Sequence, residues 1–160
     1  MATTRWLDEQ EMAAWISFLE VTHRVFRSVE TQLKEDEGLS HPQYEILVKL
    51  AAAGEAGLRM TVLADSLITP KSGLTYQVGQ LEKRGLVLRR ACDADVRGVT
   101  ARITAEGMDV LRAAAPGHVA RVREVLIDQL DRRQLLALAD ALGTVNARLR
   151  EQADGPVGAT

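Results

Sequence analysis

The residues best suited to bind a ligand by charge and hydrogen bonding lie in one stretch of the chain, from Thr69 to Arg97. This stretch holds six lysine or arginine residues and three acidic ones, although the whole chain has a net charge of −2. A basic segment on an acidic body is the charge pattern expected of a focused nucleic-acid site. A solvated surface would give the same count, so charge alone leaves both interpretations open.

Apolar residues in this stretch recur at helical spacing. Leu74, Val78 and Leu81 predict an amphipathic helix with a polar face opposite to them. Thr69 is a suitable N-cap for this helix, Pro70 suits its first position, and Gly85 ends it. A brief helix before it is expected to begin at a cap formed by Thr61 and to carry the apolar residues Val62, Leu63, Ala64 and Leu67.

Two short strands are expected directly after the glycine. Alternating apolar residues predict them around Leu86 and Leu88, and around Val99, Ala101 and Ile103. The polar run from Cys92 to Gly98 is the expected turn between them. Two helices followed by a hairpin predict a winged helix-turn-helix, in which the second helix enters the major groove of DNA and the hairpin, or wing, lies beside it.

This arrangement predicts which side chains contact DNA. Ser72 and Thr75 are suited to base edges or phosphates, Lys71 to a phosphate, and Tyr76 to a phosphate or a thymine methyl group. Arg97 is expected to enter a narrow minor groove, with Asp95 supporting it or the turn. The full set of expected DNA contacts is Lys71, Ser72, Thr75, Tyr76, Gln80, Arg89, Arg90 and Arg97. Because Arg89 and Arg90 alternate faces of a strand, one of the two is expected to face DNA and the other solvent.

Long helices flank the predicted DNA-binding lobe. A first helix is expected from about Asp8 to Lys34, ended at Gly38, and a second opens at Ser40 with Gln43 completing a capping box. Thr104 is expected to cap a helix to about Leu130, which Pro116 should kink or split. Its expected buried positions are Met108, Leu111, Ala115, Val119, Val122, Leu126 and Leu130. Asp131 with Gln134 should cap a last helix.

The resulting fold class is mainly α with a small β-hairpin wing: a winged helix-turn-helix flanked by N- and C-terminal dimerisation helices. The expected divisions are an N-terminal dimerisation helix (1–37), the DNA-binding lobe (38–104), C-terminal dimerisation helices (105–152) and a flexible tail (153–160). Apolar residues with 3-4 spacing on the last helix, and the apolar face of the first, exceed what one lobe can bury. They predict a homodimer. The residues on the last helix are Leu135, Leu138, Leu142, Val145 and Leu149.

The ordered set of motifs resembles the MarR family of regulators over nearly the whole chain. The matching segments are Leu39-Ser40-x-x-Gln43, Leu63-Ala64-Asp65-Ser66-Leu67, Lys71-Ser72, Leu81-Glu82-Lys83-Arg84-Gly85-Leu86-Val87, Asp95-x-Arg97 and Ile103-Thr104-x-x-Gly107. The resemblance implies a cytoplasmic transcriptional regulator that binds a pseudo-palindromic double-stranded operator, a repressor released by a small effector such as an aromatic acid.

The resemblance also implies an effector pocket between the dimerisation helices and the DNA-binding lobe. The residues expected to line it are Trp15, His23, Arg27, His41 and Tyr44. For Trp15 and His23 taken singly, an ordinary place in the core of the first helix is the favoured interpretation. The alternative function is a thiol-based redox sensor using Cys92, which follows two arginines but adjoins an aspartate.

Other classes of protein are disfavoured. No glycine-rich phosphate loop, Ser/His/Asp set or pair of carboxylates in a recognisable frame predicts an enzyme, and no cofactor is expected. Cys92 is the only cysteine, and the three histidines are far apart in the sequence, so no metal site is expected. No apolar run approaches the roughly 20 residues that span a membrane, and the N-terminus lacks the apolar stretch of a signal peptide.

Overall fold

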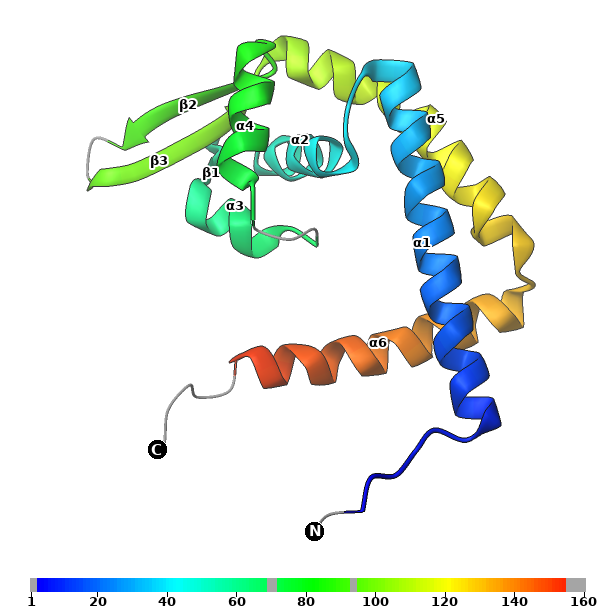
Figure 1. Cartoon of the computed structure of the whole chain (residues 1–160). Helices are drawn as coiled ribbons and strands as arrows, with labels where there is room; N and C mark the ends of the chain where they lie inside the picture. Colours follow the sequence, from blue (N-terminus) through cyan, green and yellow to red (C-terminus); the bar gives the residue numbers. More distant parts are fainter. Residues whose placement is uncertain (1–2, 69–71, 93–94, 155–160) are drawn as a thin grey trace, which may run out of the picture. The chain divides into compact units, whose positions relative to one another are not determined.

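A computed structural model describes residues 3–68, 72–92 and 95–154 of the chain (Figure 1). Two units pack separately, Met1–Arg121 and Val122–Thr160. The first contains α1 (Glu9–Glu37), α2 (His41–Ala53), the short helix η1 (Gly54–Ala56), three strands, α3, α4 and most of α5. The fold class predicted from the sequence is confirmed, since the chain is mainly helical with a small antiparallel sheet.

The helices begin where side chains supply the missing hydrogen bonds. Ser40 and Gln43 form the predicted capping box of α2, with Ser40 Oγ accepting from the Gln43 N–H at 3.3 Å. Asp8 and Glu11 form a second box at the start of α1. That helix extends three residues beyond the predicted end at Lys34 and stops at Gly38, whose φ of 63° favours glycine.

The sheet has the strand order β1-β3-β2, from β1 (Leu58–Arg59), β3 (Asp95–Ile103) and β2 (Val87–Cys92). β2 and β3 are antiparallel, with Val87 opposite Ile103 and Cys92 opposite Asp95. The strands therefore extend into the run predicted as a turn from Cys92 to Gly98. Strand pairing uses backbone groups, so polar side chains did not prevent it. Val87 is buried and Leu88 is half exposed, so the buried face of β2 lies one residue away from the predicted one.

Two helices of the lobe begin at different residues from those predicted. α3 (Met60–Ser66) begins one residue before Thr61, with Arg59 as its N-cap, because β1 ends there. α4 (Leu74–Lys83) begins after Gly73, whose φ of 87° is incompatible with a helix continuing through it. The predicted start at Thr69 and Pro70 is therefore wrong, and these two residues lie outside the described part of the chain.

α5 (Ala105–Val125) ends five residues before the predicted Leu130 and is followed by η2 (Ile127–Gln129). It is not split at Pro116. Its fully buried residues are Gly107 and Ala114; of the predicted buried positions Val119 is exposed and the others are half-buried. Gly107 is buried because the start of α5 packs closely on the backbone of Leu86, a contact that apolar spacing does not reveal.

The second unit contains η2 and α6 (Arg132–Asp154). Asp131 and Gln134 form the predicted capping box, with Asp131 Oδ1 accepting from the Gln134 N–H at 2.8 Å and Gln134 Oε1 accepting from the Asp131 N–H at 3.0 Å. The apolar positions Leu142, Val145 and Leu149 of α6 are exposed in the single chain.

The core of the first unit comes mainly from α2, α4 and the strand β2. Its largest fully buried side chains are Leu33, Leu39, Ile46, Leu47, Leu50, Leu63, Leu81, Val78 and Val87. By contrast, α1 is exposed over most of its length, and only Val29, Gln32 and Leu33 are buried on it. Across the described ranges, no helix is both long and apolar enough to cross a membrane.

Candidate nucleic-acid interface

α4 presents a polar face because its apolar face is used by the core. Leu74, Val78 and Leu81 are buried, while Thr75 and Tyr76 point away from them into solvent. Tyr76 is 65 % exposed, which leaves both its ring and its hydroxyl free to meet a ligand. This is the face on which the sequence places base contacts.

Two contacts hold α4 in position from either end. On the N-terminal side, the buried carboxylate of Glu45 on α2 accepts the backbone N–H of Ile68, in the segment that leads to α4. On the C-terminal side, Arg84 donates to the carbonyl oxygens of Gly38 at 2.9 Å and Glu37 at 3.0 Å. These carbonyls lie at the end of α1, where a cation is favourable. The residue that ends α4 is thus tied to the end of α1, and α4 itself packs on α2.

The other residues predicted for the helix lie in different environments. Ser72 precedes α4 in an exposed turn and is not part of the helix, because the helix begins only after Gly73. Gln80 is half-buried. Lys71 lies outside the described residues. The structure therefore places Thr75 and Tyr76 together on α4 and separates Ser72 from them.

The two neighbouring arginines of β2 have different surroundings. Arg89 lies on the same face as the buried Val87 and forms an ion pair with Glu82 of α4, with Nη2 and Oε2 2.6 Å apart. Arg90 is exposed and lies on the opposite face, as alternation along a strand requires. The side chains of Cys92, Asp95 and Arg97 lie outside what the structure describes.

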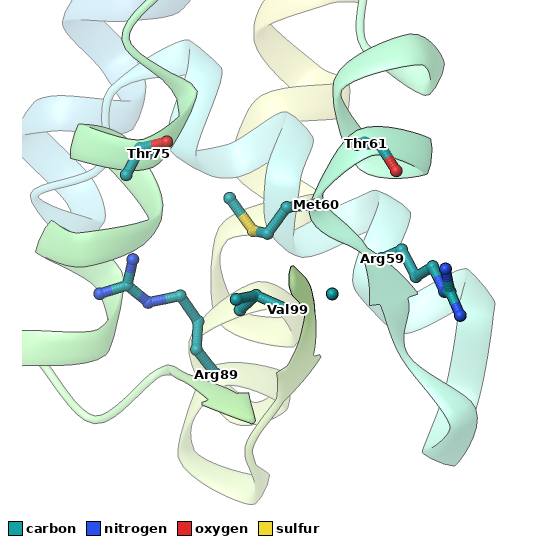
Figure 2. A pocket seen from close by; sticks show the side chains of 7 residues that line it. Arg59, Met60, Thr61, Thr75, Arg89 and Val99 are labelled. Atoms are coloured by element: carbon teal, nitrogen blue, oxygen red, sulfur yellow. The ribbon is translucent and has the colours of Figure 1, made fainter. Parts of the chain in front are cut away.

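A cavity of about 310 Å³ opens between α4, the start of α3 and the base of the hairpin (Figure 2). Thr75 and Arg89 line one side of it, and Arg59 and Thr61 line another. Neither Arg59 nor Thr61 was expected from the sequence to line a site. Their residue types and spacing give no such signal, because the pairing of β1 with β3 is what brings them to the cavity.

The hairpin is anchored to the helix that follows it. Thr104 Oγ1 donates to the carbonyl oxygen of Gly85 at 2.7 Å and accepts the N–H of Gly107 at 3.0 Å, so it acts as the predicted cap of α5. The backbone N–H of Thr104 also donates to the carbonyl oxygen of Leu86 at 3.0 Å. The start of β2 and the end of β3 are thereby held against the first turn of α5.

A second cavity, of about 390 Å³, lies between α1 and the first turn of α2. It brings together three of the five residues predicted for an effector pocket: His23, Arg27 and His41. Its other lining residues are Thr22, Phe26, Glu30 and Pro42. The Glu30 carboxylate accepts the backbone N–H of His41 at 2.6 Å, which joins the two helices at the cavity wall.

The remaining two predicted pocket residues do not line this cavity. Trp15 lies further towards the start of α1 and stacks on Phe18, with the ring centroids 6.2 Å apart. Tyr44 is buried against His118 of α5 at 4.5 Å between ring centroids, and burial raises the pKa of its hydroxyl. No role was expected for His118 from the sequence.

His118 lies close to the second cavity without lining it. Its ring is 6.2 Å from that of His41, measured between centroids. Burial, with a smaller effect of the neighbouring His41, lowers the pKa of His118. Its buried Nδ1 has no hydrogen-bond partner among the described residues. In the same part of the chain, no three His, Cys, Asp or Glu side chains gather closely enough to hold a metal ion.

Comparison with known proteins agrees with this arrangement. The model of the MarR family matches residues 39–99. The crystal structure of Sco3205, a MarR family transcriptional regulator from Streptomyces coelicolor in complex with DNA, is 38 % identical, with a TM-score of 0.86 over 93 % of this chain and 97 % of that one. AbsC, a MarR family transcriptional regulator from the same organism, is also 38 % identical, with a TM-score of 0.82 over 92 % and 99 %.

A curated relative agrees in sequence. The HTH-type transcriptional regulator MhqR of Bacillus subtilis (strain 168) is 28 % identical over 109 residues, which are 66 % of this chain and 74 % of that protein. The similarity to the two Streptomyces proteins extends over nearly the full length of both chains, flanking helices included. On the fold, the matched residues and these relatives, this chain belongs to the MarR family of transcriptional regulators.

Proposed function

We propose that the protein is a homodimeric, sequence-specific DNA-binding regulator, a repressor that a small aromatic acid releases from its operator. The observation that carries the DNA-binding part is the exposed pair Thr75 and Tyr76 on a helix whose other face is packed, in a chain 38 % identical to a regulator solved with DNA. A helix held in this way fits the major groove.

The homodimer is supported by apolar surface that a single chain leaves exposed. On α1, side chains such as Met12, Trp15 and Phe26 are about half exposed, and on α6 so are Leu142 and Val145. Exposed apolar surface on this scale marks an interaction site. A second copy is the occupant we propose, because a two-fold axis would also pair two recognition helices for a pseudo-palindromic operator.

The effector is supported by the cavity between α1 and α2. Its volume of about 390 Å³ lies in the range typical of small-molecule sites. Phe26 and Pro42 offer apolar contact, while the guanidinium of Arg27 is suited to a carboxylate. An aromatic acid satisfies both requirements. Repression follows from the physical exclusion of other proteins from operator DNA that the dimer occupies.

One sequence of experiments tests these proposals. The purified protein selects duplexes from a random pool at low salt, and sedimentation measures its mass with and without the selected duplex. We expect a pseudo-palindromic duplex bound by two copies, with affinity falling steeply as salt rises. If no duplex is enriched at low salt, the proposal of sequence-specific DNA binding is contradicted. An enriched duplex that benzoate-type acids never release contradicts the effector proposal alone.

A further inference from the structure

The base of the wing is fastened to the recognition helix α4 by one carboxylate. Arg89 on β2 donates to Glu82 Oε2 from Nε at 2.9 Å and from Nη2 at 2.6 Å. The backbone N–H of Arg89 donates to the other oxygen, Oε1, at 3.1 Å. We call this three-bonded contact the Glu82–Arg89 clasp. It joins the last turn of α4 to the third residue of β2.

The clasp lies across the helix surface. A Cβ atom on Gly79 would lie 4.0 Å from Nη2 of Arg89, so the guanidinium passes over the helix at a position without a side chain. Figure 2 shows the same guanidinium pointing towards the helix that carries Thr75. The Nε and Nη2 donors of Arg89 are thus directed at Glu82 of α4.

The carboxylate is held in its charged form by this contact. The hydrogen bonds from the Arg89 side chain lower the pKa of Glu82. Both side chains keep about one third of their surface exposed, at 31 % for Arg89 and 33 % for Glu82. An ion pair this accessible contributes little to the free energy of unfolding. The effect of the ion pair is geometric, because two side-chain hydrogen bonds and one backbone hydrogen bond fix the position of β2 relative to α4.

We propose that Arg89 is a positioning residue, which with Glu82 sets the angle between the recognition helix and the wing, and does not itself contact DNA. The inference rests on the proposed DNA-binding function and replaces the expectation that Arg89 is one of the DNA contacts. The angle matters because α4 and the wing must enter neighbouring grooves of one duplex together.

The competing role for Arg89 is a direct phosphate contact, and the two roles predict opposite signs for one substitution. Glu82→Gln removes a negative charge beside the DNA-binding surface and weakens the hold on Arg89. If Arg89 bound phosphate, this variant would bind DNA more tightly, because repulsion falls and the arginine is freed. If Arg89 positions the wing, the same variant binds DNA more weakly.

The test uses the full-length protein and the duplex that it selects from a random pool. We expect Glu82→Gln and Arg89→Ala each to weaken binding by about tenfold, the effect of losing a charge-assisted contact. The double variant should bind no more weakly than either single variant, because both break the same contact. The salt dependence of Arg89→Ala should match that of the wild type.

Two matched controls accompany these variants. Glu55→Gln removes the same charge from an exposed site in η1, outside the clasp, and should leave affinity unchanged or slightly tighter. Arg90→Ala removes the same charge as Arg89→Ala from the opposite face of β2. The salt dependence of its DNA binding shows the effect of losing an exposed cation. Circular dichroism confirms that each variant is folded.

Each outcome decides the proposal. Tighter binding by Glu82→Gln overturns it, as does a salt slope for Arg89→Ala that falls by about one, the signature of a lost phosphate contact. If Glu82→Gln does not fold, Glu82→Asp keeps the charge and shortens the reach, and unchanged affinity then overturns the proposal. A wild type that selects no duplex refutes the proposed function itself, which is a different result from a selected duplex that Glu82→Gln binds normally.

Discussion

The backbone of Gly107 at the start of α5 lies directly against the carbonyl oxygen of Leu86, so closely that a Cβ atom on Gly107 would lie 2.1 Å from that oxygen. Real atoms do not approach to this distance, and the neighbour is backbone, which cannot rotate away. Leu86 also accepts the backbone N–H of Thr104. This contact is where the wing, the recognition helix and α5 meet.

Replacing Gly107 should therefore destabilise the first unit. We expect Gly107→Ala to lower the free energy of unfolding by about 3 kcal/mol, the upper range for forced overpacking, as measured by urea denaturation. Gly79→Ala is the matched control, since its Cβ would meet only Arg89 at 4.0 Å. That variant should gain about 1 kcal/mol from helix propensity. Equal stability of the two variants would show that α5 can move away from Leu86.

The apolar positions of α6 provide a test of the homodimer. Leu142→Asp places an uncompensated charge where a second copy is proposed to pack, so dimer association should weaken by roughly a hundredfold. Sedimentation across a concentration series measures the change. Thr144→Asp adds the same charge to the opposite side of α6 and should leave the mass unchanged. A wild type that sediments as a monomer at micromolar concentration would refute the dimer.

Residues that read the DNA sequence and residues that only bind its backbone should differ in how their loss affects binding to cognate and to random duplexes. Thr75→Ala and Tyr76→Ala remove groups proposed to meet base edges, where one contact discriminates by roughly 1–3 kcal/mol, so they should weaken cognate binding more than random binding. Arg97→Ala should weaken both and reduce the salt slope by about one. Equal losses for Thr75→Ala on both duplexes would mean that sequence is read elsewhere.

The lowered pKa of His118 makes stability depend on pH. Below its ordinary pKa of 6.5 the unfolded chain takes up a proton that the folded protein resists. Stability is therefore fully present above that pH and falls as pH drops through the window below it. His118→Gln should flatten this dependence in denaturation curves. His23→Gln, an exposed change on α1, should retain it, and a flattened curve for both variants would assign the effect elsewhere.

The order of the helices and of the hairpin, and several helix ends, follow from local sequence patterns. Ser40 with Gln43, Asp131 with Gln134, and Gly38 act within a few residues of themselves, through caps that need no distant partner. The same local logic identified the outward positions Thr75 and Tyr76, because the spacing of Leu74, Val78 and Leu81 defines the buried face of α4.

Which residues contact one another across elements depends on tertiary packing. Arg89 and Arg90 are adjacent and chemically identical in the sequence, yet one is bound to Glu82 and the other is exposed. On α5, Gly107 is buried because the backbone of Leu86 packs there. In the same way, α1 and α2 bring His23, Arg27 and His41 to one cavity and leave Trp15 outside it. Such contacts join residues far apart along the chain, so they depend on how the elements pack together, which local spacing does not encode.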